Sequence, residues 1–181
     1  MLNEKIICAG FGGQGVMLIG QLISYAGMLE GKEVSWLPSY GPEMRGGTAN
    51  CSVMVSERTI GSPVITNDAT TAIVMNLPSL DKFESDITPK GNLIINSSLI
   101  EKKASRTDVA TYYIPANEIA VEIGNSRVAN MVMLGAYLEL TKVVEIDSVM
   151  KALKKIFGDS KAHLLDVNRV ALQKGAELLK Q

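Results

Sequence analysis

The stretch Ile6-Ile7-Cys8-Ala9-Gly10-Phe11-Gly12-Gly13-Gln14-Gly15 decides the fold of this chain. Its first four residues are continuously apolar, which is typical of a short parallel strand buried on both faces. Gly10, Gly12 and Gly15 then match the spacing G-x-G-x-x-G. Apolar residues recur at helical spacing over 14–30, and Gly31 suits the end of that helix. The stretch therefore predicts a strand over 5–9 that turns tightly into a helix.

Gly10, Gly12, Gly13, Gln14 and Gly15 are the first candidates for a binding site. Glycine lets a phosphate approach the backbone, and a helix N-terminus favours negative charge. Three interpretations stay open: an NAD or FAD site, a tight turn without a ligand, and a contribution to a phosphate-bearing ligand or partner loop. A dinucleotide site also needs an acid where the second strand ends, and the strand predicted over 33–37 is closed by Pro38 without one.

A second glycine-rich stretch is Ser39-Tyr40-Gly41-Pro42-Glu43-Met44-Arg45-Gly46-Gly47-Thr48. Arg45 offers a planar cation to a phosphate or carboxylate, and Tyr40 offers a stacking face or a hydroxyl. The alternative for Glu43 and Arg45 is a local ion pair. Gly46 and Gly47 allow close backbone approach. Because both stretches follow strands, we expect them at the same edge of the sheet, where open α/β sheets bind ligands.

The rest of the chain alternates strands with helices. A strand over 48–56, a turn at Glu57-Arg58 and a return strand from Ile60 predict a hairpin that makes the sheet mixed. Further strands are expected over 69–76, 91–97 and 108–114, and further helices over 77–83, 116–122, 129–140, 146–157 and 164–179. The helix over 129–140 is apolar all round, so we expect it to be buried. The prediction is one α/β domain over residues 1–181, three-layered α/β/α and Rossmann-like, with a mixed sheet and a β-hairpin insertion.

Composition excludes several classes of function. The formal net charge of −1 gives no reason to expect nucleic acid. Cys8 and Cys51 are too few for an iron–sulfur cluster and are expected to be buried and reduced, and the single histidine, His163, is expected at the surface. We therefore predict no metal site. The sequence shows no secretory signal and no apolar run near the roughly 20 residues of a membrane span, so the cytoplasm is the expected location.

These motifs together resemble the gamma subunit of 2-oxoacid:ferredoxin oxidoreductases. The resemblance covers nearly the whole chain and rests on Gly10–Val16, Ser39–Ala49, Ser62-Pro63, Asn96-Ser97, Gly124-Asn125 through Asn130-Met131, and Leu134-Gly135-Ala136. The run Met75–Phe83, with Asn96–Ile100, is most similar to the 2-oxoglutarate branch. Gamma subunits for other oxoacids (2-oxoisovalerate, pyruvate or indolepyruvate) stay open as alternatives, as does a stand-alone dinucleotide-binding enzyme.

The resemblance implies an oxidative decarboxylation in which a 2-oxoacid and coenzyme A give acyl-CoA, carbon dioxide and reduced ferredoxin. Thiamine diphosphate and iron–sulfur clusters are then expected in other subunits, and this chain is expected to bind no cofactor alone and to supply no catalytic residue. It is expected to pack against those subunits, to meet ferredoxin only through the complex, and to be inactive when isolated, with self-association of the isolated chain left open. Arg45 and the turn Gly10–Gly15 are expected to face coenzyme A, so Arg45→Ala should raise the Michaelis constant for coenzyme A.

Overall fold

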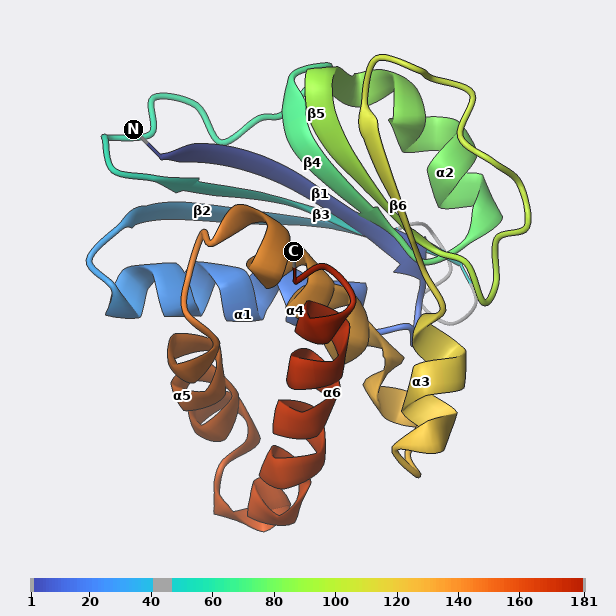
Figure 1. Ribbon diagram of the computed structural model, residues 1–181. Coiled ribbons are helices and arrows are strands. Elements are labelled where there is room, and N and C mark those ends of the chain that lie inside the picture. Colours follow the sequence, from blue (N-terminus) through green and yellow to red (C-terminus); the bar gives the residue numbers. More distant parts are fainter. Residues whose placement is uncertain (1, 41–46, 181) are drawn as a thin grey trace.

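The computed structural model describes residues 2–40 and 47–180. Within these ranges six strands form one sheet in the order β2-β3-β1-β4-β5-β6 (Figure 1). The strands are β1 (Asn3–Phe11), β2 (Glu33–Tyr40), β3 (Thr48–Ser56), β4 (Ala69–Val74), β5 (Ile87–Asn96) and β6 (Ala110–Ile114). The helices are α1 (Val16–Leu29), α2 (Leu77–Phe83), α3 (Ala116–Glu122), α4 (Ala129–Thr141), α5 (Ile146–Phe157) and α6 (Leu165–Glu177). Short 3-10 segments lie at η1 (Glu84–Asp86), η2 (Ser126–Val128) and η3 (Asp159–Leu164).

The sheet is mixed, as predicted, although the hairpin is not the predicted one. Strand β1 pairs in parallel with β4 and antiparallel with β3, and β2 pairs antiparallel with β3. The return strand from Ile60 is wrong, because residues 57–68 contain no strand. Both edges of β3 are already occupied, by β1 and by β2, so no edge remains for a strand that would follow it. The hairpin is therefore formed by β2 and β3, which the second glycine-rich stretch connects in the sequence.

The predicted end of β2 at Pro38 is also wrong. The strand continues to Tyr40, and Pro38 lies opposite Cys51 of β3. Proline lacks the N–H that a central strand needs, and it is tolerated in edge strands. Strand β2 is the edge of the described sheet, so the proline does not end it.

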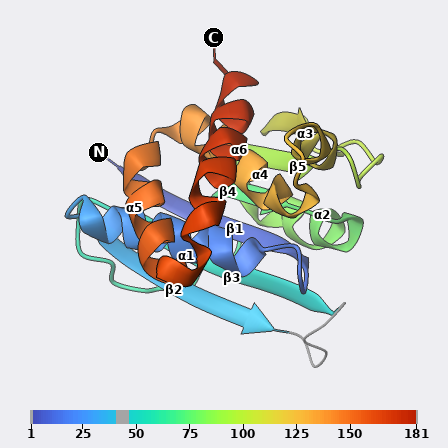
Figure 2. The same ribbon diagram turned by 90° about the horizontal axis from the view of Figure 1, so that it is seen from below.

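Helices cover both faces of the sheet, which confirms the three-layer prediction. Helix α2 lies on one face, and α1, α4, α5 and α6 lie on the other (Figures 1 and 2). All ten residues of α4 from Ala129 to Leu138 are buried, because the helix contacts both α6 and the strand β5. This burial confirms what the apolar pattern of that helix predicted. No helix in residues 2–40 or 47–180 has the length and apolar character to cross a membrane.

Candidate functional site

The glycine turn after β1 is held in place from two directions. The N–H of Gly12 donates to the carbonyl of Gly47 over 2.9 Å, which joins the two glycine-rich stretches. The side chain of Gln14 accepts from the N–H of Phe11 over 2.7 Å and donates to the carbonyl of Met75 over 3.2 Å. The turn is therefore fixed to the second stretch on one side and to the end of β4 on the other. The described ends of the second stretch, Tyr40 and Gly47, lie at the same edge of the sheet as the glycine turn.

The first turn of α1 is open to an anion. Gly15 caps the helix in the left-handed conformation with φ of 79°, and it provides no side chain to accept from the helix N–H groups. The first helical bond runs from Ile19 to Gly15, so the N–H groups of the residues between them have no partner within the helix. No acidic residue lies in this first turn. The positive end of the helix dipole is therefore available to a negatively charged ligand.

A cavity of about 320 Å³ lies between the turn and the end of β2. It is lined by Phe11, Gly12, Gly13, Gly15, Val16, Met17, Leu18, Tyr40 and Ala49. Tyr40 is 54% exposed, so its ring and hydroxyl are accessible beside the helix N-terminus. Among the predicted site residues Glu43, Arg45 and Gly46 lie outside the described residues. Tyr40 and the glycine turn thus meet at one concave surface, which combines apolar walls with free backbone N–H groups.

A second cavity, of about 340 Å³, lies on the other side of the turn. It is lined by Gly13, Gln14, Met75, Asn117, Ser126, Arg127, Ala129 and Asn130. Arg127 is exposed in the segment that leads into α4, and the described residues place no carboxylate within ion-pair distance of it. A guanidinium that pairs with no carboxylate of the described residues, beside the N-terminus of α1, favours a phosphate or a carboxylate as its ligand.

Four residues of this second cavity were missed as site residues from the sequence: Asn117, Ser126, Arg127 and Asn130. Asn125 caps the short segment η2 that precedes α4, since its side chain accepts from the N–H of Arg127 over 3.0 Å. The signal that could have found Asn117 is the strand-end residue Asn96, whose side-chain amide donates to it over 2.8 Å.

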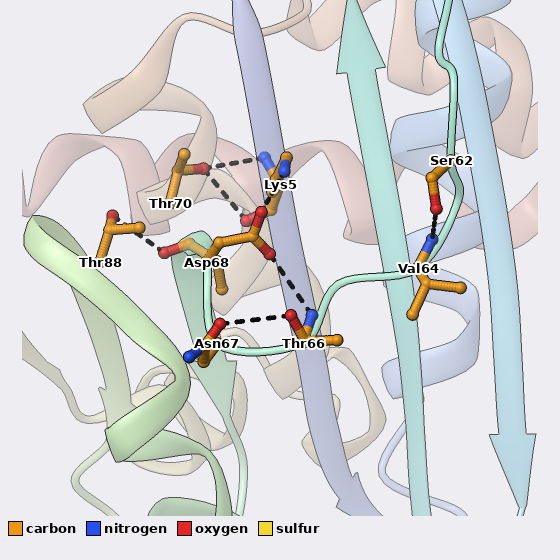
Figure 3. A network of polar contacts seen from close by, with 9 residues as sticks. Lys5, Ser62, Val64, Thr66, Asn67, Asp68, Thr70 and Thr88 are labelled. Atoms are coloured by element: carbon orange, nitrogen blue, oxygen red, sulfur yellow. Dashed lines mark hydrogen bonds and ion pairs between the residues drawn. The ribbon is translucent and has the colours of Figure 1, made fainter.

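A larger cavity, of about 510 Å³, lies away from the glycine turn and is lined by an ion pair that holds the fold together. It is at the opposite edge of the sheet, under the segment 57–68. Lys5 forms an ion pair there with Asp68, whose carboxylate also accepts from the N–H of Thr66 (Figure 3). Thr70 accepts from the N–H of Lys5 over 2.9 Å (Figure 3). These contacts fasten the segment to β1 and leave the lysine charge paired, so we assign the site to the edge that carries the glycine turn.

The chemistry of the site is that of binding. Its two cavities offer backbone N–H groups, amides, a guanidinium and a phenol, and neither is lined by a carboxylate in the part of the chain that the structure describes. The described residues also contain no group of three or more His, Cys, Asp or Glu side chains that would hold a metal ion. Cys8 and Cys51 are buried and His163 is exposed, as predicted. The fold and the site thus define a Rossmann-like α/β domain with an anion-oriented surface.

The chain belongs to the pyruvate ferredoxin/flavodoxin oxidoreductase family, whose model matches residues 5–178. It is 37% identical to the ketoisovalerate oxidoreductase subunit VorA of Methanothermobacter thermautotrophicus, over 96% of this chain and 36% of that one. It is 35% identical to the 2-oxoglutarate synthase subunit KorC of Methanocaldococcus jannaschii, over 99% of this chain and 96% of that one. The chain therefore spans about a third of the first of these relatives and nearly all of the second.

A solved structure shares the fold across almost the whole chain. It is that of 2-oxoglutarate:ferredoxin oxidoreductase from Magnetococcus marinus with 2-oxoglutarate, coenzyme A and succinyl-CoA bound. The TM-score is 0.89 and the sequence identity 26%, over 99% of this chain and 32% of that one. The mixed sheet and its helical layers are thus a fold that also occurs as one part of a longer chain.

Proposed function

We propose that this chain is the gamma-type subunit of a 2-oxoacid:ferredoxin oxidoreductase. The complex oxidatively decarboxylates a 2-oxoacid with coenzyme A and yields acyl-CoA, carbon dioxide and reduced ferredoxin. The observation that carries the proposal is the end-to-end match with the KorC subunit, at 35% identity over 96% of that relative. We expect this subunit to need the remaining subunits of the complex for activity.

Within the complex the chain forms part of the surface that faces coenzyme A. Coenzyme A carries phosphate groups, and the residues that follow the glycine turn offer N–H groups that have no partner within the helix, with Arg127 on one side and Tyr40 on the other. The related oxidoreductase of Magnetococcus marinus has coenzyme A bound. Arg45, which lies outside the described residues, adds a second cation to this proposal on the strength of the sequence alone.

The cofactors of the reaction are assigned to partner subunits. Iron–sulfur clusters need several thiolates, whereas the chain has two cysteines, and both are buried in the core. Thiamine diphosphate carries a charged diphosphate, and a divalent cation that accompanied it would need oxygen ligands from the protein. The two cavities beside the turn are lined by no carboxylate among the described residues, so they do not fit such a group. We assign thiamine-binding and iron–sulfur subunits as the partners, with ferredoxin reached through them, and the cytoplasm as the location.

The oxoacid that we propose is 2-oxoglutarate. The KorC relative, a 2-oxoglutarate synthase subunit, is 35% identical over 99% of this chain. The run Met75–Phe83 supports the same branch at the level of sequence. A subunit for 2-oxoisovalerate, pyruvate or indolepyruvate is the second candidate. Among these three oxoacids, the 37% identity to the ketoisovalerate subunit favours 2-oxoisovalerate.

The topology argues against a stand-alone dinucleotide-binding enzyme. In that class the acid that holds the ribose follows the strand next to β1. Here β3 separates β2 from β1, so the end of β2 is displaced by two strand spacings, about 10 Å, from the glycine turn. The residues from Trp36 to Tyr40 also include no acid.

The test is purification of the tagged chain from its native host, followed by two assays. We expect thiamine-binding and iron–sulfur subunits to co-purify, and the eluate to reduce a viologen dye when both 2-oxoglutarate and coenzyme A are added. Pyruvate, 2-oxoisovalerate and indolepyruvate, assayed in parallel, identify the branch. A chain that elutes alone and binds NAD would contradict the proposal.

A further inference from the structure

Cys8 and Cys51 face each other directly across the antiparallel strands β1 and β3. Both are free thiols, both are fully buried, and both belong to the core on the α1 side of the sheet. Opposed residues of antiparallel strands have Cα atoms about 4.5–5.5 Å apart. A disulfide spans Cα atoms that are about 4.4–6.8 Å apart. The two cysteines therefore have the separation and the shared face that a cross-strand disulfide needs.

The two thiols are not equivalent. Cys51 has a lowered pKa, because Cys8 hydrogen-bonds to it and the indole of Trp36 and the backbone N–H of Gly20 add to the effect against the opposing cost of burial. The contact with Cys51, together with burial, raises the pKa of the Cys8 thiol. The thiolate is the nucleophile, so Cys51 reacts first and Cys8 stands beside it as the second thiol.

The sulfur of Cys51 lies directly beneath the start of α1. Its thiol donates to the carbonyl of Val16 over 3.5 Å. A Cβ atom placed on Gly20 would come within 2.4 Å of the same sulfur, so helix and sulfur are in tight contact. Any movement of this sulfur toward Cys8 removes the hydrogen bond to Val16 and the support under the first turns of α1. Those turns follow the glycine turn of the candidate site.

We propose that Cys8 and Cys51 form a reversible disulfide when the protein meets a hydroperoxide, and that this bond loosens the first turn of α1. In the first step the Cys51 thiolate attacks a peroxide oxygen. The S–O bond forms, the O–O bond breaks, and the hydroxide that leaves hydrogen peroxide takes up the proton released by the Cys51 thiol, so the products are a sulfenic acid and water. In the second step the Cys8 sulfur attacks the Cys51 sulfur, the S–S bond forms, and the oxygen leaves as a second water with the Cys8 proton. Two thiols lose two electrons, and one hydrogen peroxide becomes two waters.

The test is a peptide map of the full 181-residue chain after stepwise treatment with hydrogen peroxide. The treated protein is denatured, its remaining thiols are alkylated, and it is digested without reduction. Met28 is 56% exposed, so its sulfoxide reports that the oxidant has acted. We expect a peptide pair joined through Cys8 and Cys51 that dithiothreitol separates. We also expect faster amide hydrogen exchange over residues 19–22, whose N–H groups donate to the carbonyls at the start of α1, in the oxidised protein, with the original rate restored by reduction.

Variants assign the order of the steps. Cys8→Ala should leave a sulfenic acid on Cys51 that dimedone traps, and Cys51→Ala should leave Cys8 alkylatable at the same dose. The wild-type peptide map tests the disulfide by itself, even if neither variant folds. Two alkylated cysteines in protein whose Met28 is oxidised would overturn the proposal, as would a sulfinic acid on Cys51 beside a free Cys8. A linked pair with unchanged exchange over residues 19–22 would overturn the coupling to α1.

Discussion

The side-chain amide of Asn130 lies 3.4 Å from the carbonyl oxygen of Gly15, across 115 residues of sequence. This contact joins the start of α4 to the start of α1. It also leaves no room at position 15, because a Cβ there would come within 2.3 Å of the amide nitrogen of Asn130. Gly15 is therefore required twice, for its left-handed conformation and for the approach of Asn130.

Gly15→Ala and Gly13→Ala separate these two requirements. Both glycines have positive φ, 79° and 101°, so alanine is strained by about 1–2 kcal/mol at either position. A Cβ on Gly13 meets nothing within 4 Å, whereas one on Gly15 meets Asn130. We expect urea unfolding to show a further loss of about 1–3 kcal/mol for Gly15→Ala alone. Equal losses for the two variants would show that the contact with Asn130 places no demand on position 15.

The crossing of α4 and α6 depends on two other glycines. A Cβ on Gly135 would lie 2.0 Å from the carbonyl oxygen of Leu172, and one on Gly175 would lie 1.9 Å from that of Val132. These are backbone atoms of the facing helix, which a side-chain rotation does not relieve. We expect Gly135→Ala and Gly175→Ala each to lower the free energy of unfolding by about 3 kcal/mol or more.

Gly27→Ala is the matched control for the helix crossing. Gly27 also lies inside a helix, and its Cβ would meet a side-chain methyl of Val34 at 2.7 Å, which can move. We expect a clearly smaller loss of stability for this variant in the same thermal or urea measurement. A loss as large as that of Gly135→Ala would contradict the close backbone contact as the cause.

The dependence of stability on pH has two opposite contributions at the start of β1. Burial raises the pKa of Glu4 above its usual 4.5, against hydrogen bonds from Thr70 and Thr71 that lower it. The native state therefore holds this proton more tightly than the unfolded state, and its contribution is lost as pH rises from 4.5 through the folded pKa. The Lys5 ammonium lowers the pKa of Asp68 below 3.8. The stability that the Asp68 carboxylate contributes is therefore lost as pH falls below 3.8.

Glu4→Gln and Asp68→Asn test these signs. Glu4→Gln keeps an oxygen that accepts from Thr70 and removes the titration, so stability should fall less between pH 4.5 and neutrality than in the wild type. Asp68→Asn should lose stability at neutral pH and show a shallower fall below pH 3.8. Unfolding midpoints measured across the pH range give both slopes. Parallel curves for wild type and Glu4→Gln would contradict a raised pKa for Glu4.

Much of the fold could be predicted from local patterns. The strand–turn–helix around Gly10–Gly15, the strand over 48–56 and the buried helix over 129–140 follow from apolar periodicity and glycine placement, and all are present. The order of the strands could not be read in this way. It depends on which edges of the sheet are free, and this is why the return strand from Ile60 and the end of β2 at Pro38 were wrong.

Only part of the candidate site could be predicted from the sequence. The glycine turn and Tyr40 belong to the two glycine-rich stretches, each of which follows a predicted strand. Their place at one edge of the sheet could therefore be predicted. Arg127 and Asn117 come from the starts of other helices, and only the packing of α3 and α4 against the ends of the strands brings them beside Gly13. Nothing in their local sequence marks that approach.

The proposed recognition of coenzyme A by the glycine turn and Arg127 is tested most directly by the Michaelis constant for coenzyme A in the assembled complex. Removing a charge-assisted hydrogen bond costs about 1.5–3 kcal/mol, which is about tenfold or more in affinity. Arg127→Ala should therefore raise the Michaelis constant for coenzyme A about tenfold and leave that for the oxoacid unchanged. Arg169→Ala, which removes an exposed guanidinium paired with Asp147, is the control and should change neither constant. An unchanged constant for coenzyme A in an intact Arg127→Ala complex would contradict the account.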